Sequence, residues 1–368
     1  MRENLYLQDI LIGNKMILET YGSLEEKEKF FDNKKNMVLY YRVDTTKKLE
    51  ETIKKIKKAR ESSTNVVLVT RGVSEAKYKL YTSAQREWMT NEWGRQGITF
   101  PEFVGRLLDH IKTDFIEKYF QSMGVRINHL LLLSFLQHYR APSPLLDFTT
   151  DPNVALFFAL EHMQGISHGS QDIENYFSIY TILMDKSRSW DVRFSYALEK
   201  VMQKRREKRR EDEKNGQLYK NETVATIGLA ELLDWLPNKH IKGSGLCKKP
   251  ILFLTNPSDT NPKMPSYLSW SNPNIIAQKG CFLLNTHEKQ PLEKKFLEEK
   301  ESKLLKNAAL FCLDIHKSLA PYIRERYLKP EGITKETIYP DFNAIANEAY
   351  EAFKRCPKER NISRVCFE

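Results

Sequence analysis

The sequence predicts an α+β protein in which a small, mainly antiparallel sheet is flanked by helices. Three observations support this fold class. Segments with helical periodicity occur separately along the chain, short β-branched or aromatic runs lie between them, and neither a repeat nor a Gly/Ser-rich linker divides the 368 residues. With 41% apolar residues, the chain is long enough to bury a substantial core.

Helices are predicted where apolar residues recur at a period of 3.6. The first begins after Asp44 or Thr45, either of which can cap it. A long amphipathic helix begins at Phe100 and continues to Tyr119. Asp151 and Pro152 are typical of a helix cap and first position. The further helices predicted by the same criteria cover residues 129–139, 151–163, 223–236 and 341–353. Residues 137–150, QHYRAPSPLLDFTT, are therefore expected to connect two helices.

Strands are predicted from short runs rich in β-branched and aromatic residues. The first, VVLVT, is followed at once by Arg71 and Gly72, so the chain should deliver an arginine at the carboxyl end of a buried strand. The five predicted strands cover residues 66–70, 176–183, 250–255, 280–284 and 309–315.

Composition narrows the class of protein. No window approaches the roughly 18 apolar residues of a membrane span, and the N-terminal residues lack the pattern of a signal peptide, so a cytoplasmic protein without membrane contact is expected. The five cysteines form no C-x-x-C pair and the histidines no H-x-x-x-H pair, so no metal site is predicted.

The formal charge of +10 could attract a polyanion. Much of it is local, however. Residues 204–214 hold seven basic and four acidic side chains and no apolar one, which is typical of a solvated helix or loop.

Arg71 is the first candidate for a binding role, because an arginine at the end of a buried strand can present a fixed fork of donors to a phosphate, carboxylate or ribose hydroxyl. An arginine that pairs with a nearby carboxylate at the sheet edge is an equal alternative. Gly72 favours the binding role slightly, since glycine permits a close backbone approach.

The remaining candidates each have a structural alternative. His138 could act as an acid, a base or a ligand donor, but a histidine near a helix C-terminus is also favoured by the helix dipole. Asp147, Thr149 and Thr150 exceed what a helix cap requires, although one of them is explained by capping. Gln278 lies two residues before Gly280 and could instead hydrogen-bond a backbone group.

No P-loop, Rossmann, nucleophile-elbow or Cys/His signature is present. Four stretches together nevertheless resemble the FRG domain family, named for a Phe-Arg-Gly motif. In TRGVSEAKYKLYTSAQR, Thr70 stands where phenylalanine is usual, and Ser83 and Arg86 fit the pattern that follows. The four stretches cover residues 70–86, 137–160, 275–284 and 327–350. Three positions depart from the family pattern: Arg140 stands for a glycine, and Pro144 and Asn274 each stand for an arginine.

The resemblance implies a domain at residues 46–350 with a charged insertion near 200–217, preceded by an extension at 1–45 and followed by a tail at 351–368. The order of an arginine-ended strand, a Thr-Thr turn before an apolar helix and a later glutamine also looks like the three-part plan of ADP-ribosyltransferases, and an ADP-ribosyltransferase-like core is expected by that analogy.

By the same analogy the ligand is a nucleotide, with NAD as the substrate, and the reaction is ADP-ribosyl transfer or NAD glycohydrolysis. Arg71, His138, Asp147 and Gln278 are the expected catalytic residues. The residues expected to contact the nucleotide are Gly72, Ser83, Arg86, Phe148, Thr149 and Thr150. Two alternatives remain: a non-catalytic module that binds nucleic acid or a protein through its basic surface, and a toxin or defence effector of unknown reaction.

Overall fold

The structure is a computed structural model, which describes part of the chain. The described residues are 18–31, 38–61, 66–123, 127, 129–166, 172–185, 207–208, 210–211, 213–215, 251–254, 274–285, 287–294 and 309–355. The predicted helix at 223–236 lies outside them. The described residues of the charged segment, between 207 and 215, are all exposed, as predicted for a solvated segment.

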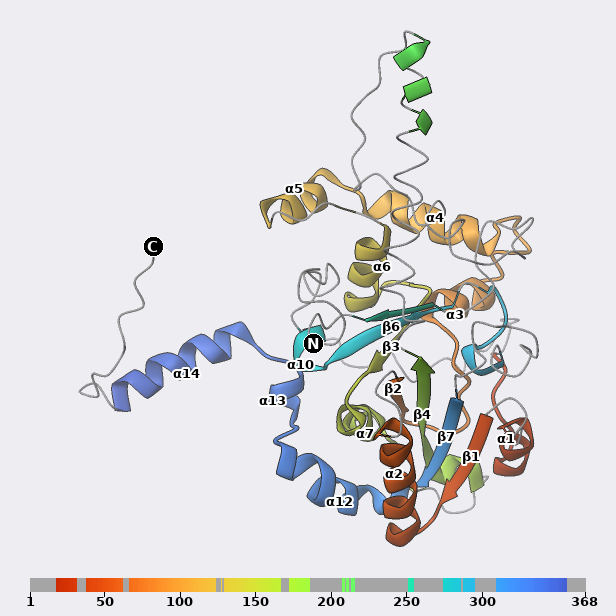
Figure 1. The fold of residues 1–368 in the computed structure, drawn as a ribbon, viewed down its shortest axis with the longest axis vertical. Helices are drawn as coiled ribbons and strands as arrows, with labels where there is room; N and C mark the ends of the chain where they lie inside the picture. Colours follow the sequence, from red (N-terminus) through yellow and green to blue (C-terminus); the bar gives the residue numbers. More distant parts are fainter. Residues whose placement is uncertain are drawn as a thin grey trace.

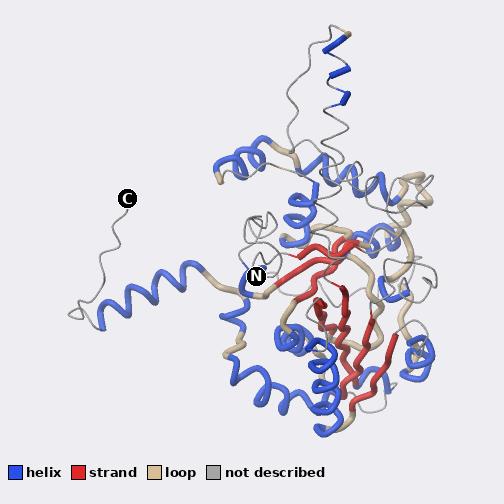
Figure 2. The backbone as a smooth tube through the Cα atoms, viewed as in Figure 1, coloured by secondary structure: helices blue, strands red, loops and turns tan. Residues whose placement is uncertain are grey.

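A single sheet with seven described strands runs through the body in the order β1-β7-β4-β2-β3-β6-β5 (Figures 1 and 2). Only β1 and β7 pair in parallel, so the prediction of a mainly antiparallel sheet is confirmed. The prediction of a small sheet is wrong, because β1 and β3 add to the five predicted strands. The strand bounds are β1 Val38–Val43, β2 Val66–Val73, β3 Leu145–Thr149, β4 Tyr176–Asp185, β5 Ile251–Leu254, β6 Gly280–Leu284 and β7 Ala309–His316.

Strand β3 corrects the prediction that residues 137–150 join two helices directly. It has only five residues, LLDFT, and follows Pro144, so its length and its central aspartate conceal the strand pattern. All five residues pair with β6 in antiparallel register. Strand β1, VLYYRV, lies within the segment predicted to be an N-terminal extension and contributes a strand to the sheet. Strand β2 continues past Thr70, so Arg71 and Gly72 lie inside the strand rather than after its end.

Most predicted helices are confirmed within one or two residues at their N-termini. Asp151 caps α7 with its carboxylate, which accepts from Asn153 N at 2.9 Å. The prediction of a single helix from Phe100 to Tyr119 is wrong. Helix α4 ends at Ile111, and a second helix, α5, begins at Asp114 with its own cap, Thr113. The described helices of eight or more residues are α1 Leu24–Phe31, α2 Thr46–Glu61, α3 Ser83–Thr90, α4 Phe100–Ile111, α5 Asp114–Ser122, α6 His129–His138, α7 Pro152–Glu161 and α14 Phe342–Arg355.

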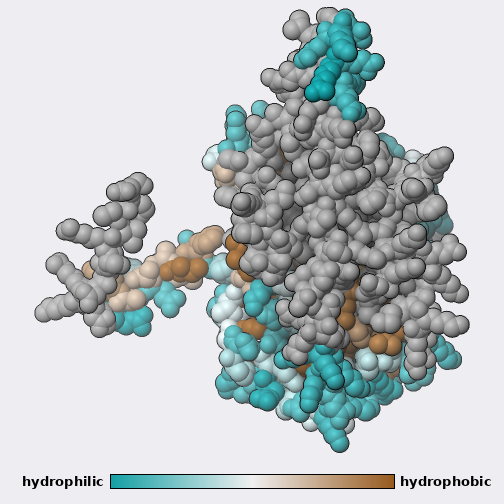
Figure 3. Space-filling model, in the orientation of Figure 1, coloured by the Kyte–Doolittle hydropathy of each residue, from teal (hydrophilic) through white to brown (hydrophobic). Residues whose placement is uncertain are grey.

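Three short helices also bear on the site and on the core: α10 Asn274–Ala277, α12 Ala320–Ile323 and α13 Lys335–Ile338. Helix α14 follows α13 and extends away from the body (Figures 1 and 3). It contains no buried residue.

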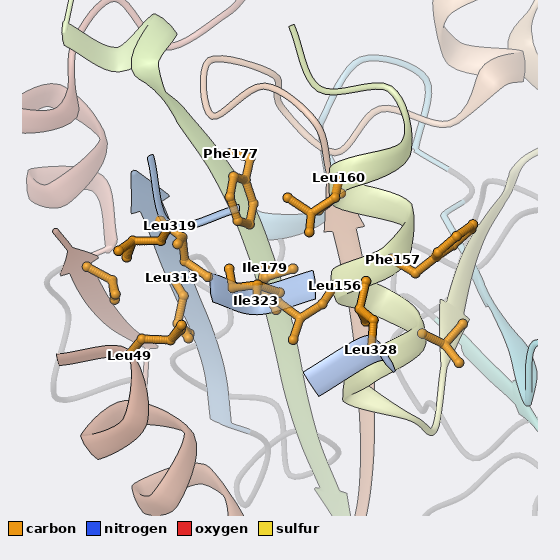
Figure 4. Close-up of a cluster of buried hydrophobic side chains, with 14 of the residues drawn as sticks. Leu49, Leu156, Phe157, Leu160, Phe177, Ile179, Leu313, Leu319, Ile323 and Leu328 are labelled. Atoms are coloured by element: carbon orange, nitrogen blue, oxygen red, sulfur yellow. The ribbon is translucent and has the colours of Figure 1, made fainter. Parts of the chain in front are cut away.

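Apolar residues on one side of the sheet divide into two clusters. One lies where α2, α7 and α12 pack on β1, β7, β4 and β2, and includes Leu49, Leu156, Phe177 and Leu313 (Figure 4). The other lies where α3, α4 and α6 pack on β3 and β6. A third cluster covers the opposite face, from Val38 in β1 to Leu283 in β6. Strand β3 therefore lies at the boundary between two helical packing units.

Gly72 explains how α7 packs so close to β2. A Cβ added at Gly72 would lie 2.0 Å from Ala155 O and 2.7 Å from Ala159 N, distances that the backbone of α7 cannot tolerate. This close contact fixes α7, and with it the turn between β3 and α7, against the strand that holds Arg71.

Candidate functional site

The candidate site lies where β2 and β3 separate. Strand β2 pairs with β4 over all eight of its residues but with β3 at one position, Thr70 with Thr149. Arg71 follows that position. Its Nη1 donates to Asp147 O at 2.6 Å and lies 3.9 Å from Asp147 Oδ2. A charged side chain thus connects the two strands at the point where their backbone hydrogen bonds end.

The end of α6 completes this cluster. Gln137 Nε2 donates to Asp147 Oδ2 at 2.6 Å, a charge-assisted hydrogen bond. The assignment of the amide follows from this contact, because the carboxylate can only accept when ionised. Gln137 Oε1 is then a buried acceptor that bonds to no described atom of the protein. His138, the last residue of α6, packs edge to face on Tyr139 with ring centroids 4.6 Å apart.

The charges of Asp147 and His138 act on each other. Loss of hydration raises the pKa of Asp147 above its ordinary value of 3.8, and this outweighs Arg71 and Gln137, which lower it. Loss of hydration lowers the pKa of His138 below its ordinary 6.5, although Asp147 opposes that change. The side chain of Asp147 is nevertheless 56% exposed. Arg71, Gln137, His138 and Asp147 together form the Asp147 cluster, in which solvent still reaches the carboxylate.

Arg140 occupies a backbone conformation that favours glycine. Its φ is +61°, and two hydrogen bonds close the end of α6 around it, from Arg140 N to Gln137 O at 3.3 Å and from Ala141 N to Leu136 O at 2.9 Å. This is a Schellman motif with Arg140 at the left-handed position. The glycine expected here from the family pattern therefore has a physical reason, which this chain overrides with a charged residue.

Tyr339 and Glu161 lie beside the cluster and were missed by the sequence analysis. The Tyr339 hydroxyl donates to Glu161 Oε2 at 2.7 Å. Its pKa is raised, first by burial and then by Glu161, and the charges of Arg140 and Asp147 also act on it. No motif could have indicated this pair, because its members lie 178 positions apart in the sequence.

Thr149 and Gln278 are brought together, but through a backbone group. Thr149 Oγ1 donates to Gln278 O at 2.7 Å and accepts from Asp151 N at 3.0 Å. The side chain of Gln278 donates to Ile338 O at 3.3 Å, which is the backbone hydrogen bond considered as its alternative role. These contacts join the turn before α7 to the turn before β6 and to α13. In this structure the two side chains hold the walls of the site together.

Other predicted contact residues stabilise the elements around the Asp147 cluster. Ser83 Oγ donates to Ser143 O at 3.2 Å and accepts from Ser143 N at 3.0 Å, which fixes α3 to the loop before β3. Arg86 Nη1 donates to Tyr81 O at 2.8 Å. Phe148 is buried in the third cluster, on the face of the sheet opposite α7. Thr150 Oγ1 lies 3.4 Å from Lys279 O.

The described part of the chain holds no cluster of metal ligands and no membrane-spanning helix. No three His, Cys, Asp or Glu side chains gather there as metal ligands would. Nor does any of its helices have the length and apolar character needed to cross a membrane.

The fold and the site together define a mixed α/β protein in which a cluster of polar side chains lies where two central strands separate. Residues 67–166 match the family model of the FRG domain. The chain therefore carries an FRG domain, which contains Arg71, Gln137, His138, Arg140 and Asp147. The resemblances at residues 275–284 and 327–350 lie outside the match. No curated protein and no solved structure matches the chain, so the ADP-ribosyltransferase-like core remains a prediction.

Proposed function

We propose that the Asp147 cluster binds a nucleotide, with NAD as the ligand, and that the protein hydrolyses the bond between nicotinamide and ribose. The observation that supports this proposal most strongly is the convergence of Arg71, Gln137 and His138 on Asp147. Titratable groups that lie together and have shifted pKa values are typical of functional sites.

Each side chain has a chemical property that suits this ligand. The Arg71 guanidinium is a fixed fork of donors for phosphate or ribose oxygens, held in place by Asp147 O. Gln137 Oε1 is a buried acceptor for a hydroxyl or amide donor of the ligand. The lowered pKa of His138 keeps its ring neutral at pH 7, so it can accept a proton.

Asp147 supplies the negative charge that the reaction needs. As the C1′–N bond breaks, its electron pair moves to the pyridinium nitrogen, and nicotinamide leaves as a neutral molecule. Positive charge develops on the ribose, where a carboxylate stabilises it. The oxygen of a water molecule then bonds to C1′, and its proton passes to Asp147 or His138. Gln278, the other residue expected to be catalytic, cannot supply this charge, because its side chain is an uncharged amide.

Release of nicotinamide from NAD, followed by chromatography, tests the proposal. The wild-type chain should release nicotinamide, and Asp147→Asn should reduce the rate at least about 100-fold, because a group that stabilises charge in the transition state typically contributes that much. His138→Gln should reduce it by a similar factor if the ring accepts the proton.

Matched controls come from exposed residues of α4 that are not part of the Asp147 cluster. Asp109→Asn and His110→Gln make the same chemical changes and should leave the rate unchanged. No release by the wild-type chain above the spontaneous rate would overturn the proposed reaction. Equal rates for Asp147→Asn and the wild type would overturn the catalytic role of the Asp147 cluster.

A further inference from the structure

Helix α14 exposes large apolar side chains from its first turn to its last. Phe342, Ile345, Tyr350 and Phe353 are between 51% and 67% exposed, although these are large side chains. In Figure 3, α14 shows brown, apolar side chains and stands clear of the body. An isolated helix of 14 residues is marginally stable in water, so a helix of this kind gains stability by packing its apolar side chains on another surface.

The large apolar residues and the two central alanines of α14 have a symmetric spacing, which Ala344 and Ala352 do not follow. Phe342, Ile345, Ala346, Ala349, Tyr350 and Phe353 are separated by 3, 1, 3, 1 and 3 positions, which is the same series in both directions. When a second α14 lies antiparallel, Phe342 therefore meets Phe353, Ile345 meets Tyr350, and Ala346 meets Ala349. The two alanines at the centre allow the backbones to approach closely, and large side chains pack at both ends.

The charges of α14 favour the antiparallel arrangement. Asp341 lies at the N-terminal end, where its carboxylate accepts from Asn343 N at 2.8 Å, and Lys354 and Arg355 form the last turn. Antiparallel packing places the acidic end of each helix beside the basic end of the other and opposes the two helix dipoles. Parallel packing would place like charges together. Glu348 lies on the side of α14 away from the apolar face.

We propose that the chain forms a homodimer through α14, packed antiparallel on the same helix of a second copy about a twofold axis. The symmetric spacing fits such an axis, because each copy then presents the same surface. The helix is about 21 Å long, since each residue adds about 1.5 Å. A contact of this size is below that of a standard stable interface, so the dimer should dissociate on dilution in a range of about 1–100 μM. This inference does not depend on the proposed function.

Sedimentation velocity of the full chain across that concentration range tests the proposal. The wild-type chain should shift from monomer to dimer, and the double change Phe342→Asp and Phe353→Asp should keep it monomeric. Phe115→Asp is the matched control, because Phe115 is 74% exposed on α5. It should leave the dimer intact.

Two further changes test the geometry. Replacing Lys354 and Arg355 together by glutamine should weaken an antiparallel dimer several-fold, whereas it would strengthen a parallel one. Glu348→Gln should leave the dimer unchanged, because Glu348 lies on the side of α14 away from the apolar face. A monomer at every concentration would overturn the proposal. So would a dimer that Phe115→Asp disrupts and the double change in α14 does not.

Discussion

Arg140 shows how one residue can depart from a conformational preference beside a site. Its φ of +61° places it in the left-handed region, which costs a residue with a Cβ about 1 kcal/mol relative to glycine. Its charge acts on Tyr339, which Asp147 also influences. Arg140 thus destabilises the backbone locally and places a cation near the Asp147 cluster, at a position where the family pattern has a glycine.

Replacing Arg140 by glycine should therefore stabilise the fold while weakening the binding of a phosphate-bearing ligand. We expect the free energy of unfolding to rise by about 0.5–1 kcal/mol. Denaturant unfolding measures it. The control is Gly332→Ala, because Gly332 has a φ of +62° and an added Cβ would touch nothing within 4 Å. That variant should lose a similar amount. A loss of stability in Arg140→Gly would contradict this account.

The pKa of Asp147 leads to a prediction for stability. Because folding raises that pKa above 3.8, ionisation of the carboxylate opposes folding, and the cost appears as the pH rises through the folded pKa. Asp147→Asn removes this cost. At pH 7 the variant should unfold at the same temperature as the wild type or at a higher one, and the difference should disappear below pH 3.8. Thermal melts across this pH range measure it, and a variant that is less stable at pH 7 would show that Asp147 is retained for stability.

At the level of secondary-structure elements, a buried cation fixes α1 to the sheet. Lys27 is fully buried, and its Nζ donates to Ala76 O at 2.7 Å, to Ser178 Oγ at 2.8 Å and to Asp314 Oδ1 at 2.8 Å. The Tyr40 hydroxyl donates to the other carboxylate oxygen of Asp314 at 3.0 Å. One side chain therefore links α1 to β4 and β7.

Lys27→Met should destabilise the fold by about 3–5 kcal/mol, because it leaves Asp314 charged and buried without its cation. Denaturant unfolding checks this value. Lys29 is exposed on the same helix, so Lys29→Met should change the free energy of unfolding by less than about 0.5 kcal/mol. Equal effects of the two changes would show that the buried pair contributes nothing.

Local patterns predicted the elements that repeat a clear period. The helices α2, α6, α7 and α14 and the strands β4, β6 and β7 begin within one or two residues of their predicted starts. Strand β3 was missed because five residues with a central aspartate contain too little alternation, and its assignment depends on pairing with β6. The break before α5 depends on one capping threonine within a continuous helical period.

The site was predictable only in part. Arg71, His138 and Asp147 could be chosen because unusual polar residues follow apolar runs. The partners Gln137, Tyr339 and Glu161 could not, since their roles depend on tertiary contacts. Thr149 and Gln278 lie close together in the structure, and the sequence gives no means of seeing that a backbone carbonyl joins them.

On the scale of the whole molecule, the sheet supports two helical packing units, and the Asp147 cluster lies between them. Helix α7 belongs to one unit and α6 to the other, while β3 carries Asp147 at their boundary. A ligand held by residues of β2, β3 and α6 would bridge strands that share one backbone pairing. Binding at this place should therefore stabilise the whole fold and not only one part of it.

Calorimetric titration with NAD, of the wild-type chain and of Arg71→Ala in parallel, tests the central claim most directly. Arg95→Ala serves as the control, because Arg95 is exposed and pairs with Glu92 on the surface. The account predicts saturable heat with the wild type and with Arg95→Ala, and at least tenfold weaker binding for Arg71→Ala, since a charge-assisted contact contributes about 1.5–3 kcal/mol. No saturable heat with the wild-type chain, or equal affinity in Arg71→Ala, would contradict it.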